Sequence, residues 1–243
     1  MSDLNTQVCS AVDGLTREFD IIANNLANLN TAGYKKQCNT FSKLLTAQES
    51  QIGLGTDGEV QLDSAYDFSQ GNFIETGGTL DFALYGSGFF VVETTQGPLY
   101  TRNGSFQLNQ NNQIVDSSGR IVSGESGPIT IPSDITLSQL TVSSDGTISA
   151  NGNTIGKFKL VDFKDQKNTL TAAGLNCYSA SSNTQAQEAT NTIVKQGYQE
   201  GSNVQMVEEL VDMITVSRLY EANMKFLEVG SENSKNLINV AMG

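Results

Sequence analysis

The N-terminal part of the chain carries an apolar stripe with the period of an α-helix. Gly33 follows it, at a place where a glycine commonly closes a helix. The pattern predicts one amphipathic helical segment over 1–36. Apolar side chains recur there at spacings of three and four, at Leu4, Val8, Ala11, Leu15, Phe19, Ile22, Leu26 and Leu29.

The C-terminal part, residues 201–243, shows the same period in a stricter form. Ser202 and Gln205 have the spacing of a capping box, which starts a helix. An alternation of four and three that is sustained this long predicts coiled-coil-like packing against another helix. Because several of its positions are serines, we expect the helix to contact more than one neighbour. The alternating positions are Met206, Leu210, Met213, Ser217, Tyr220, Met224, Leu227, Ser231, Ser234 and Ile238.

The middle of the chain changes to short β-type runs separated by Gly, Asn and Pro turn signals. These runs lie at 80–86, 88–93, 98–102, 105–109, 113–116, 120–123, 129–131, 135–142, 147–150 and 157–163. They predict an antiparallel β-rich domain over 76–178. Polar, weakly periodic stretches over 37–75 and 179–200 predict extended connectors. The predicted fold class is α+β: N- and C-terminal α-helices that pair as a coiled-coil-like bundle, with a central antiparallel β-rich domain.

Charge narrows the range of partners. The net charge is −12, and eleven acidic residues stand against four basic ones between Gly53 and Leu160. Such a middle repels phosphate backbones and anionic surfaces. No apolar run reaches the length of a membrane span, and the N-terminus MSDLNTQVCS lacks the regions of a cleaved signal peptide. We therefore expect no nucleic-acid partner and no membrane insertion, and general secretion rules alone would keep the protein inside the cell.

Candidate chemistry is sparse. Histidine is absent and the three cysteines, at 9, 38 and 177, have no metal-ligand or disulfide spacing. Gly86–Gly88 reads as a tight β-connection rather than a nucleotide loop. Asp81 and Glu93 have no spacing that favours a glycosidase pair. We expect no catalytic residues, no cofactor, no metal site and no enzyme activity.

The asparagines near the end of the first helical stripe leave two interpretations open. Asn24 and Asn28 lie four apart, opposite the apolar stripe. They form either a solvated polar face or an uncharged amide stripe that hydrogen-bonds a neighbouring subunit. Periodicity alone does not separate the two.

Four blocks of the sequence resemble the flagellar rod and hook protein family. ANNLANLNTAGYKK (23–36) is similar to its N-terminal signature. LDFALYGSGFFVV (80–92) and YTRNGSFQLN (100–109) resemble its central blocks. GYQEGSNVQMVEELVDMITVSRLYEANMKFL (197–227) resembles its C-terminal block. The blocks lie in the family's order from end to end.

The resemblance implies an axial subunit whose terminal helices bundle in an inner tube, with the β domain outside. Implied partners are other copies of the chain, related rod and hook subunits, and the flagellar type III exporter. Export by that route needs no cleaved signal peptide and implies a periplasmic rod. The modest β region favours a rod protein over a hook protein, and the short segment before the LDFAL block favours the proximal-rod over the distal-rod type.

The predicted subunit-interface residues come from two sources. The family motifs imply Asn24, Asn25, Leu26, Asn28, Asn30, Thr31, Gly33, Tyr34, Tyr220, Glu221 and Asn223. The four-three alternation adds Leu210, Met213, Met224 and Leu227. The main functional interpretation is a structural polymer subunit that transmits torque from motor to hook. The alternative is a secreted carbohydrate-binding or carbohydrate-cleaving β protein, and a phage-tail-like tube protein is a third possibility.

Overall fold

The computed structural model describes residues 2–39, 64–181 and 184–242, with side chains at 8–38, 65–166, 169–181 and 184–230. Parts of the two expected connectors, 40–63 and 182–183, lie outside the described residues. So do the side chains of Leu4, Ser231, Ser234 and Ile238. The chain divides into two compact units. Over the described residues, the helical unit comprises 2–27, 39 and 205–242, and the β unit comprises 28–38, 64–181 and 184–204.

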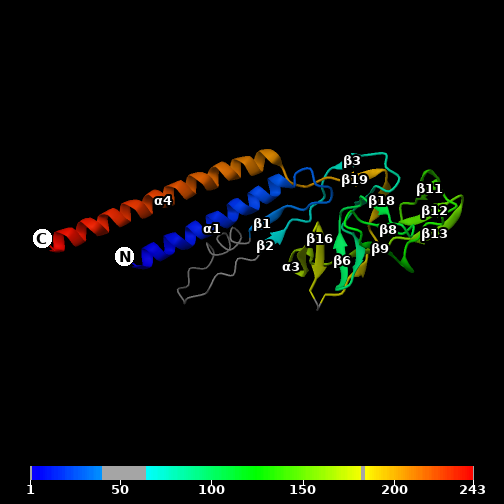
Figure 1. Cartoon of the computed structure of the whole chain (residues 1–243), viewed down its shortest axis with the longest axis horizontal. Helices are drawn as coiled ribbons and strands as arrows, with labels where there is room; N and C mark the ends of the chain where they lie inside the picture. The colour runs from blue at the N-terminus through cyan, green and yellow to red at the C-terminus, as the bar shows by residue number, and fades with distance from the viewer. Residues whose placement is uncertain (1, 40–63, 182–183, 243) are drawn as a thin grey trace. The chain divides into compact units, whose positions relative to one another are not determined.

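The helical unit is a pair of long helices, α1 (Ser2–Ala27) and α4 (Met206–Met242). They pack side by side and run in opposite directions (Figure 1). The predicted pairing of the terminal helices and the α+β class are therefore confirmed. The covered side of α4 contains the buried Glu209 and Val216, and the covered side of α1 contains the buried Ile22 and Asn25.

Both helices differ from the sequence prediction at the ends that adjoin the β unit. Helix α1 ends at Ala27, well before Gly33. The Thr31 hydroxyl donates to the Asn28 side chain, and such local side-chain bonds favour turns over helix. Helix α4 begins at Met206. The predicted capping box is wrong, because the Ser202 hydroxyl instead accepts a hydrogen bond from the Val204 N–H.

The β unit holds an antiparallel sheet of ten strands and several smaller pairings. The main path of the large sheet is β15-β16-β6-β5-β9-β8-β7, and β14 joins it through β5. Further pairs are β1-β2, β3-β19 and β4-β18, and β11-β12-β13 form a separate sheet. The first ten strands are β1 (Gln37–Asn39), β2 (Ser64–Tyr66), β3 (Phe73–Glu75), β4 (Phe82–Tyr85), β5 (Phe89–Thr94), β6 (Gly97–Thr101), β7 (Gln107–Leu108), β8 (Ile114–Val115), β9 (Ile121–Gly124) and β10 (Gly127–Pro128).

The later elements complete the β unit and include strands in the stretches expected as connectors. They are η1 (Leu137–Gln139), β11 (Leu140–Val142), β12 (Thr147–Ala150), β13 (Asn153–Lys157), β14 (Leu160–Asp162), α3 (Gln166–Thr169), β15 (Leu170–Gly174), β16 (Cys177–Ala180), β17 (Gln187–Glu188), β18 (Ile193–Gln196) and β19 (Tyr198–Glu200). The run expected at 135–142 splits, because a 3-10 turn precedes β11. Strands β3 and β19 are three residues long and pair with each other, so they are too short to show the alternation that reveals a strand in sequence.

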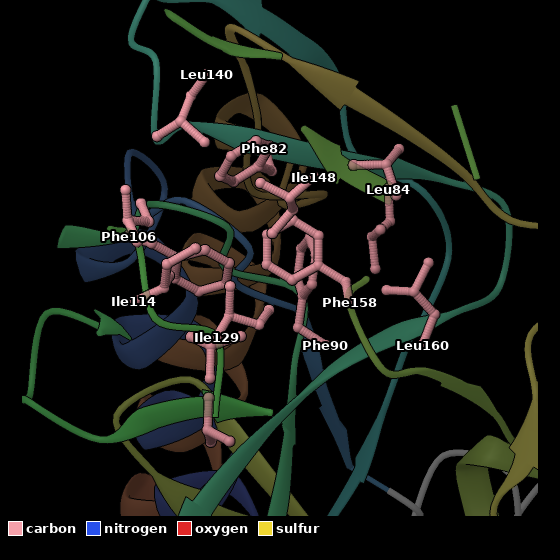
Figure 2. Close-up of a cluster of buried hydrophobic side chains, with 14 of the residues drawn as sticks. Phe82, Leu84, Phe90, Phe106, Ile114, Ile129, Leu140, Ile148, Phe158 and Leu160 are labelled. Carbon is pink, nitrogen blue, oxygen red and sulfur yellow. The ribbon is translucent and has the colours of Figure 1, made fainter. Parts of the chain in front are cut away.

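Aromatic and β-branched side chains form the core of the β unit. Figure 2 shows Phe82, Phe90, Phe106 and Phe158 pointing toward one another with aliphatic side chains around them. The rings of Phe90 and Phe106 meet edge to face with centroids 5.1 Å apart. A second cluster centres on Phe89 and Tyr178. Burial raises the pKa of Tyr178 far above its usual range, so the buried hydroxyl stays protonated.

We expect Leu84→Ala to destabilise the β unit by about 2–5 kcal/mol, because Leu84 is fully buried in the first cluster. Leu137→Ala removes the same atoms from a side chain that is 38% exposed, and we expect it to cost much less. Urea unfolding followed by tyrosine fluorescence measures both. Equal unfolding midpoints for the two variants would show that this cluster is not the stabilising core.

Candidate functional site

A buried group of charges joins four segments of the β unit that are far apart in sequence. The Lys35 ammonium lies 2.6 Å from Glu200 Oε1 and donates to the Ser69 carbonyl at 2.6 Å. Glu200 Oε1 also accepts from the Gly71 N–H at 3.0 Å. On the other oxygen, Arg102 approaches Glu200 Oε2 at 3.4 Å. We call Lys35, Arg102 and Glu200, with the backbone of Ser69 and Gly71, the Glu200 clamp.

The clamp is removed from solvent, and its charges depend on one another. The side chains of Lys35, Arg102 and Glu200 are 0%, 1% and 0% exposed. Burial lowers the pKa of Lys35 and that of Arg102, and Glu200 opposes both shifts. The Arg102 guanidinium lies over the Phe89 ring, 4.9 Å from its centroid. Two cations therefore share one carboxylate in a dry site, where removing that carboxylate costs several kcal/mol.

Further hydrogen bonds next to the clamp join the segment that follows α1 to the segment that precedes α4. The Gly33 N–H donates to the Glu200 carbonyl at 2.7 Å, and the Lys36 N–H donates to Asn203 Oδ1 at 2.7 Å. Asn203 Nδ2 donates in turn to the Asp67 carbonyl at 2.7 Å. The segment before α4 is thus bonded directly to the segment after α1.

Gly33 is required at its position by geometry. Its φ is +70°, a conformation that side-chain-bearing residues rarely adopt. A Cβ there would lie 2.4 Å from the backbone nitrogen of Asn103. The glycine therefore allows the N-terminal segment to lie directly on the Arg102 segment, rather than closing a helix.

A second buried polar contact lies in the helical unit. Asn25 Nδ2 donates to Glu209 Oε2 at 3.1 Å, and both residues are 1% exposed. The pair joins α1 to α4 through one amide and one carboxylate. The sequence pattern alone does not predict this contact, because an acidic residue in the first turn of a helix is also favoured by the helix dipole.

The structure separates the predicted N-terminal site residues. Asn24 and Asn30 are exposed, whereas Leu26 and Thr31 are half-buried. Asn25 makes the contact with Glu209. The other predicted residues of this stretch lie in the β unit: Asn28 accepts from Thr31, Gly33 packs on the Arg102 segment, and Tyr34 is buried.

The predicted residues of α4 also fall into two groups. Met213, Asn223 and Leu227 are half-buried. Leu210, Tyr220, Glu221 and Met224 are exposed. Tyr220 and Glu221 border a groove of about 450 Å³ in the helical unit, which is also lined by Leu15, Thr16, Phe19, Val216 and Ser217.

Apolar side chains remain in solvent along the helix pair. Exposed large apolar side chains of the helical unit are Phe19, Met206, Val207, Leu210, Val211, Ile214, Leu219, Tyr220, Met224, Phe226 and Val229. In the first half of α4 they are between 39% and 73% exposed. A patch this dense on a protein surface marks an interaction site.

The remaining candidates for catalytic or metal-binding side chains are few among the described residues. Asp81 accepts from Thr76 and Gln199, and Glu93 accepts from Ser123, so each carboxylate has a hydrogen-bonding role in the fold. No group of three or more metal-ligating side chains is found among the described residues. Within the same residues, no helix combines the length and apolarity needed to cross a bilayer.

These features define a structural protein with a braced β unit and an exposed helical face, and comparison with known proteins agrees. The family model "Flagella basal body rod protein" matches residues 10–35. "Flagellar hook protein FlgE/F/G D1 domain" matches 83–150, and "Flagellar basal body rod FlgEFG protein C-terminal" matches 195–240. Each match contains one charged residue of the Glu200 clamp: Lys35, Arg102 and Glu200, respectively.

Individual relatives match over nearly the whole chain. Flagellar basal-body rod protein FlgF of Caulobacter vibrioides is 34% identical over 231 residues, which cover 92% of this chain and 91% of that protein. Flagellar basal-body rod protein FlgG of Buchnera aphidicola is 33% identical, with 94% and 95% covered. FlgF of Salmonella typhimurium is 32% identical, with 88% of each covered.

The chain belongs to the family of flagellar basal-body rod proteins, of the proximal-rod type that the sequence favoured. It is a structural rod protein of the flagellar basal body. The predicted family, fold class and place in the flagellum are confirmed at this level.

We expect Glu200→Gln to destabilise the β unit by about 3–5 kcal/mol, because it leaves two buried cations without a carboxylate. Glu75→Gln, the same change at an exposed position, is the control and should stay within about 0.5 kcal/mol of wild type. Urea unfolding of the full chain provides the comparison. Equal losses of stability in the two variants would show that the Glu200 clamp does not stabilise the β unit.

We expect Asn25→Asp to weaken the pairing of α1 with α4 by about 1–3 kcal/mol at pH 7, because it places a second carboxylate against Glu209. Its neighbour Asn24 is exposed, so Asn24→Asp should have little effect. The introduced buried carboxylate has a raised pKa, so the lost stability returns as the pH falls from that raised pKa toward about 4, and it is fully restored below about 4. Amide exchange in α1 follows the effect. Equal protection in both variants at pH 7 would contradict it.

Proposed function

We propose that this chain is an axial subunit of the flagellar rod that polymerises through its terminal helices and transmits torque from motor to hook. Its partners in this proposal are other copies of itself and related rod and hook subunits. The proposal places it in the periplasmic rod, reached through the flagellar type III export apparatus without a cleaved signal peptide. It assigns the chain no catalytic activity.

The observation that carries the proposal is the exposed apolar face of α4. Val207, Val211 and Ile214 are 73%, 57% and 54% exposed although they lie on a helix that already has one partner. Fully burying a Val or Ile side chain contributes about 1.5–3 kcal/mol. A face with several such residues favours association with further helices, and repetition in every subunit favours a polymer.

The Glu200 clamp supports the torque-transmitting part of the proposal. Helix α1 is followed by the β unit from residue 28, and α4 is preceded by the β unit up to residue 204; the segments beside these two points are bonded to each other. Both helices therefore continue from one braced region. In this proposal, a force that acts on the helices is passed on to buried ion pairs and backbone hydrogen bonds of the β unit.

The predicted interface residues enter the proposal in two roles. Exposed residues such as Asn24, Leu210, Glu221 and Met224 are proposed to contact neighbouring subunits directly. Buried residues such as Asn25 are proposed to act by holding α1 and α4 in register. The groove that Tyr220 borders, beside Leu15 and Phe19, is proposed to receive an apolar side chain of a neighbour.

We expect Tyr220→Ala to reduce association more than Phe226→Ala. Tyr220 lines the groove and is 39% exposed, whereas Phe226 does not line it and is 51% exposed. Truncating a well-packed aromatic side chain costs about 3–5 kcal/mol, and in a polymer the loss recurs in every copy. Sedimentation velocity of the full chains over a range of concentrations measures the difference.

Two results would count against this assignment. A wild-type chain that stays monomeric at every concentration would contradict polymerisation itself. A larger deficit for Phe226→Ala would place the contact on another face of α4. The unfolding midpoint of the β unit serves as the folding control for both variants, because neither residue belongs to that unit.

A further inference from the structure

A lysine in the β unit lies among three aromatic rings. The Nζ atom of Lys195 is 5.3 Å from the ring centroid of Phe73, 5.7 Å from that of Tyr198 and 5.9 Å from that of Tyr85. The rings of Phe73 and Tyr85 are themselves 6.0 Å apart. The four residues come from β3, β4, β18 and β19, so the fold assembles this group from two separate parts of the chain.

The group belongs to the solvent-facing side of the β4-β18 pair. In register, Val194 stands opposite Leu84, and both are buried in the core. Alternation along the strands places Tyr85, Ile193 and Lys195 on the other side. Tyr85 is 53% exposed and Ile193 is 45% exposed. We call Phe73, Tyr85, Ile193, Lys195 and Tyr198 the Lys195 patch.

The ammonium of Lys195 has no carboxylate partner in the described part of the chain. The ion pairs between described residues involve Lys35, Arg102, Arg120 and Lys157. The negative faces of aromatic rings attract a cation and restrict its position. Lys195 is therefore a positioned surface cation whose charge remains available to a carboxylate on another molecule.

The composition of the patch is typical of an interface centre. Aromatic residues are enriched at such centres, and a contiguous apolar surface marks a binding site more strongly than scattered side chains do. The helical polymerisation proposed above does not involve this surface, since all five residues lie in the β unit.

We propose that the Lys195 patch binds an acidic surface on the β unit of a second copy of this chain. This inference rests on the proposed polymerisation. Charge complementarity supports it, because the β unit of each copy carries 12 acidic against 9 basic residues and so offers carboxylates to a fixed cation. The five patch residues include a cation and no anion, so two patches meeting face to face would bring two ammonium groups together. The contact is therefore heterologous, the kind that an open helical polymer requires.

Charge reversal at Lys195 in the full chain tests the contact. Sedimentation velocity at about 50 mM NaCl should show roughly tenfold weaker association for Lys195→Glu. Lys195→Arg keeps the cation and its attraction to the rings, and it should associate as wild type does. Lys164→Glu makes the same charge change at another exposed lysine of the β unit and should also match wild type. At about 500 mM NaCl the difference between Lys195→Glu and wild type should shrink.

Each contrary outcome has its own meaning. If wild type associates and Lys195→Glu associates equally well, the inference is overturned while the proposed polymerisation stands. If Lys195→Glu and Lys164→Glu weaken association equally, the effect comes from net charge alone, and the inference is again overturned. A wild-type chain that never associates would overturn both proposals. If Lys195→Glu and Tyr85→Ala instead lose binding to purified peptidoglycan, with self-association unchanged, the patch binds a glycan and not a second copy.

Discussion

The rest of the β unit depends on the ion pairs and the hydrogen bond that the buried carboxylate of Glu200 makes. Its two oxygens receive an ammonium, a guanidinium and a backbone N–H from segments that are far apart in sequence. A carboxylate is stable in a dry site only when it is paired in this way, and the two cations are stable there only because the carboxylate is present. The clamp therefore acts as one unit, and losing Glu200 leaves two buried cations without a carboxylate.

The two units cover their apolar side chains to different degrees. In the β unit, aromatic side chains are packed edge to face, and two buried cations share the Glu200 carboxylate. In the helical unit, one buried contact joins Asn25 to Glu209, while apolar side chains on α4 remain in solvent. A chain with this division folds part of itself completely and leaves a helical face whose burial requires other subunits, which is the physical basis of the proposed polymerisation.

The sequence predicted what depends on local periodicity. The apolar stripes located both helices, and the β-type runs located most strands from β4 to β14, because burial on one side of an element repeats with the element's own period. The prediction of the helix ends is wrong. The Asn28–Thr31 turn and the Ser202–Val204 turn depend on a few side-chain hydrogen bonds that compete with capping.

The clamp could not be predicted in this way, because it depends on long-range pairing. Lys35 and Arg102 look like ordinary surface charges in the sequence, and only the fold brings them to Glu200. One signal was available: each of them lies inside a block that resembles the family. The family motif indicates Asn25, but nothing in the sequence pattern indicates its partner Glu209, which lies in the first turn of α4. Charges within such blocks are therefore worth testing as mutual partners.

A density map of the assembled polymer at side-chain resolution tests the central claim most directly. The claim is that the Glu200 clamp braces each subunit while the exposed face of α4 makes the contacts between subunits. The account predicts Lys35 and Arg102 on Glu200 in every copy, with Val207, Val211 and Ile214 covered by helices of neighbouring subunits. A polymer in which the clamp is open, or in which those three side chains face solvent, would contradict it.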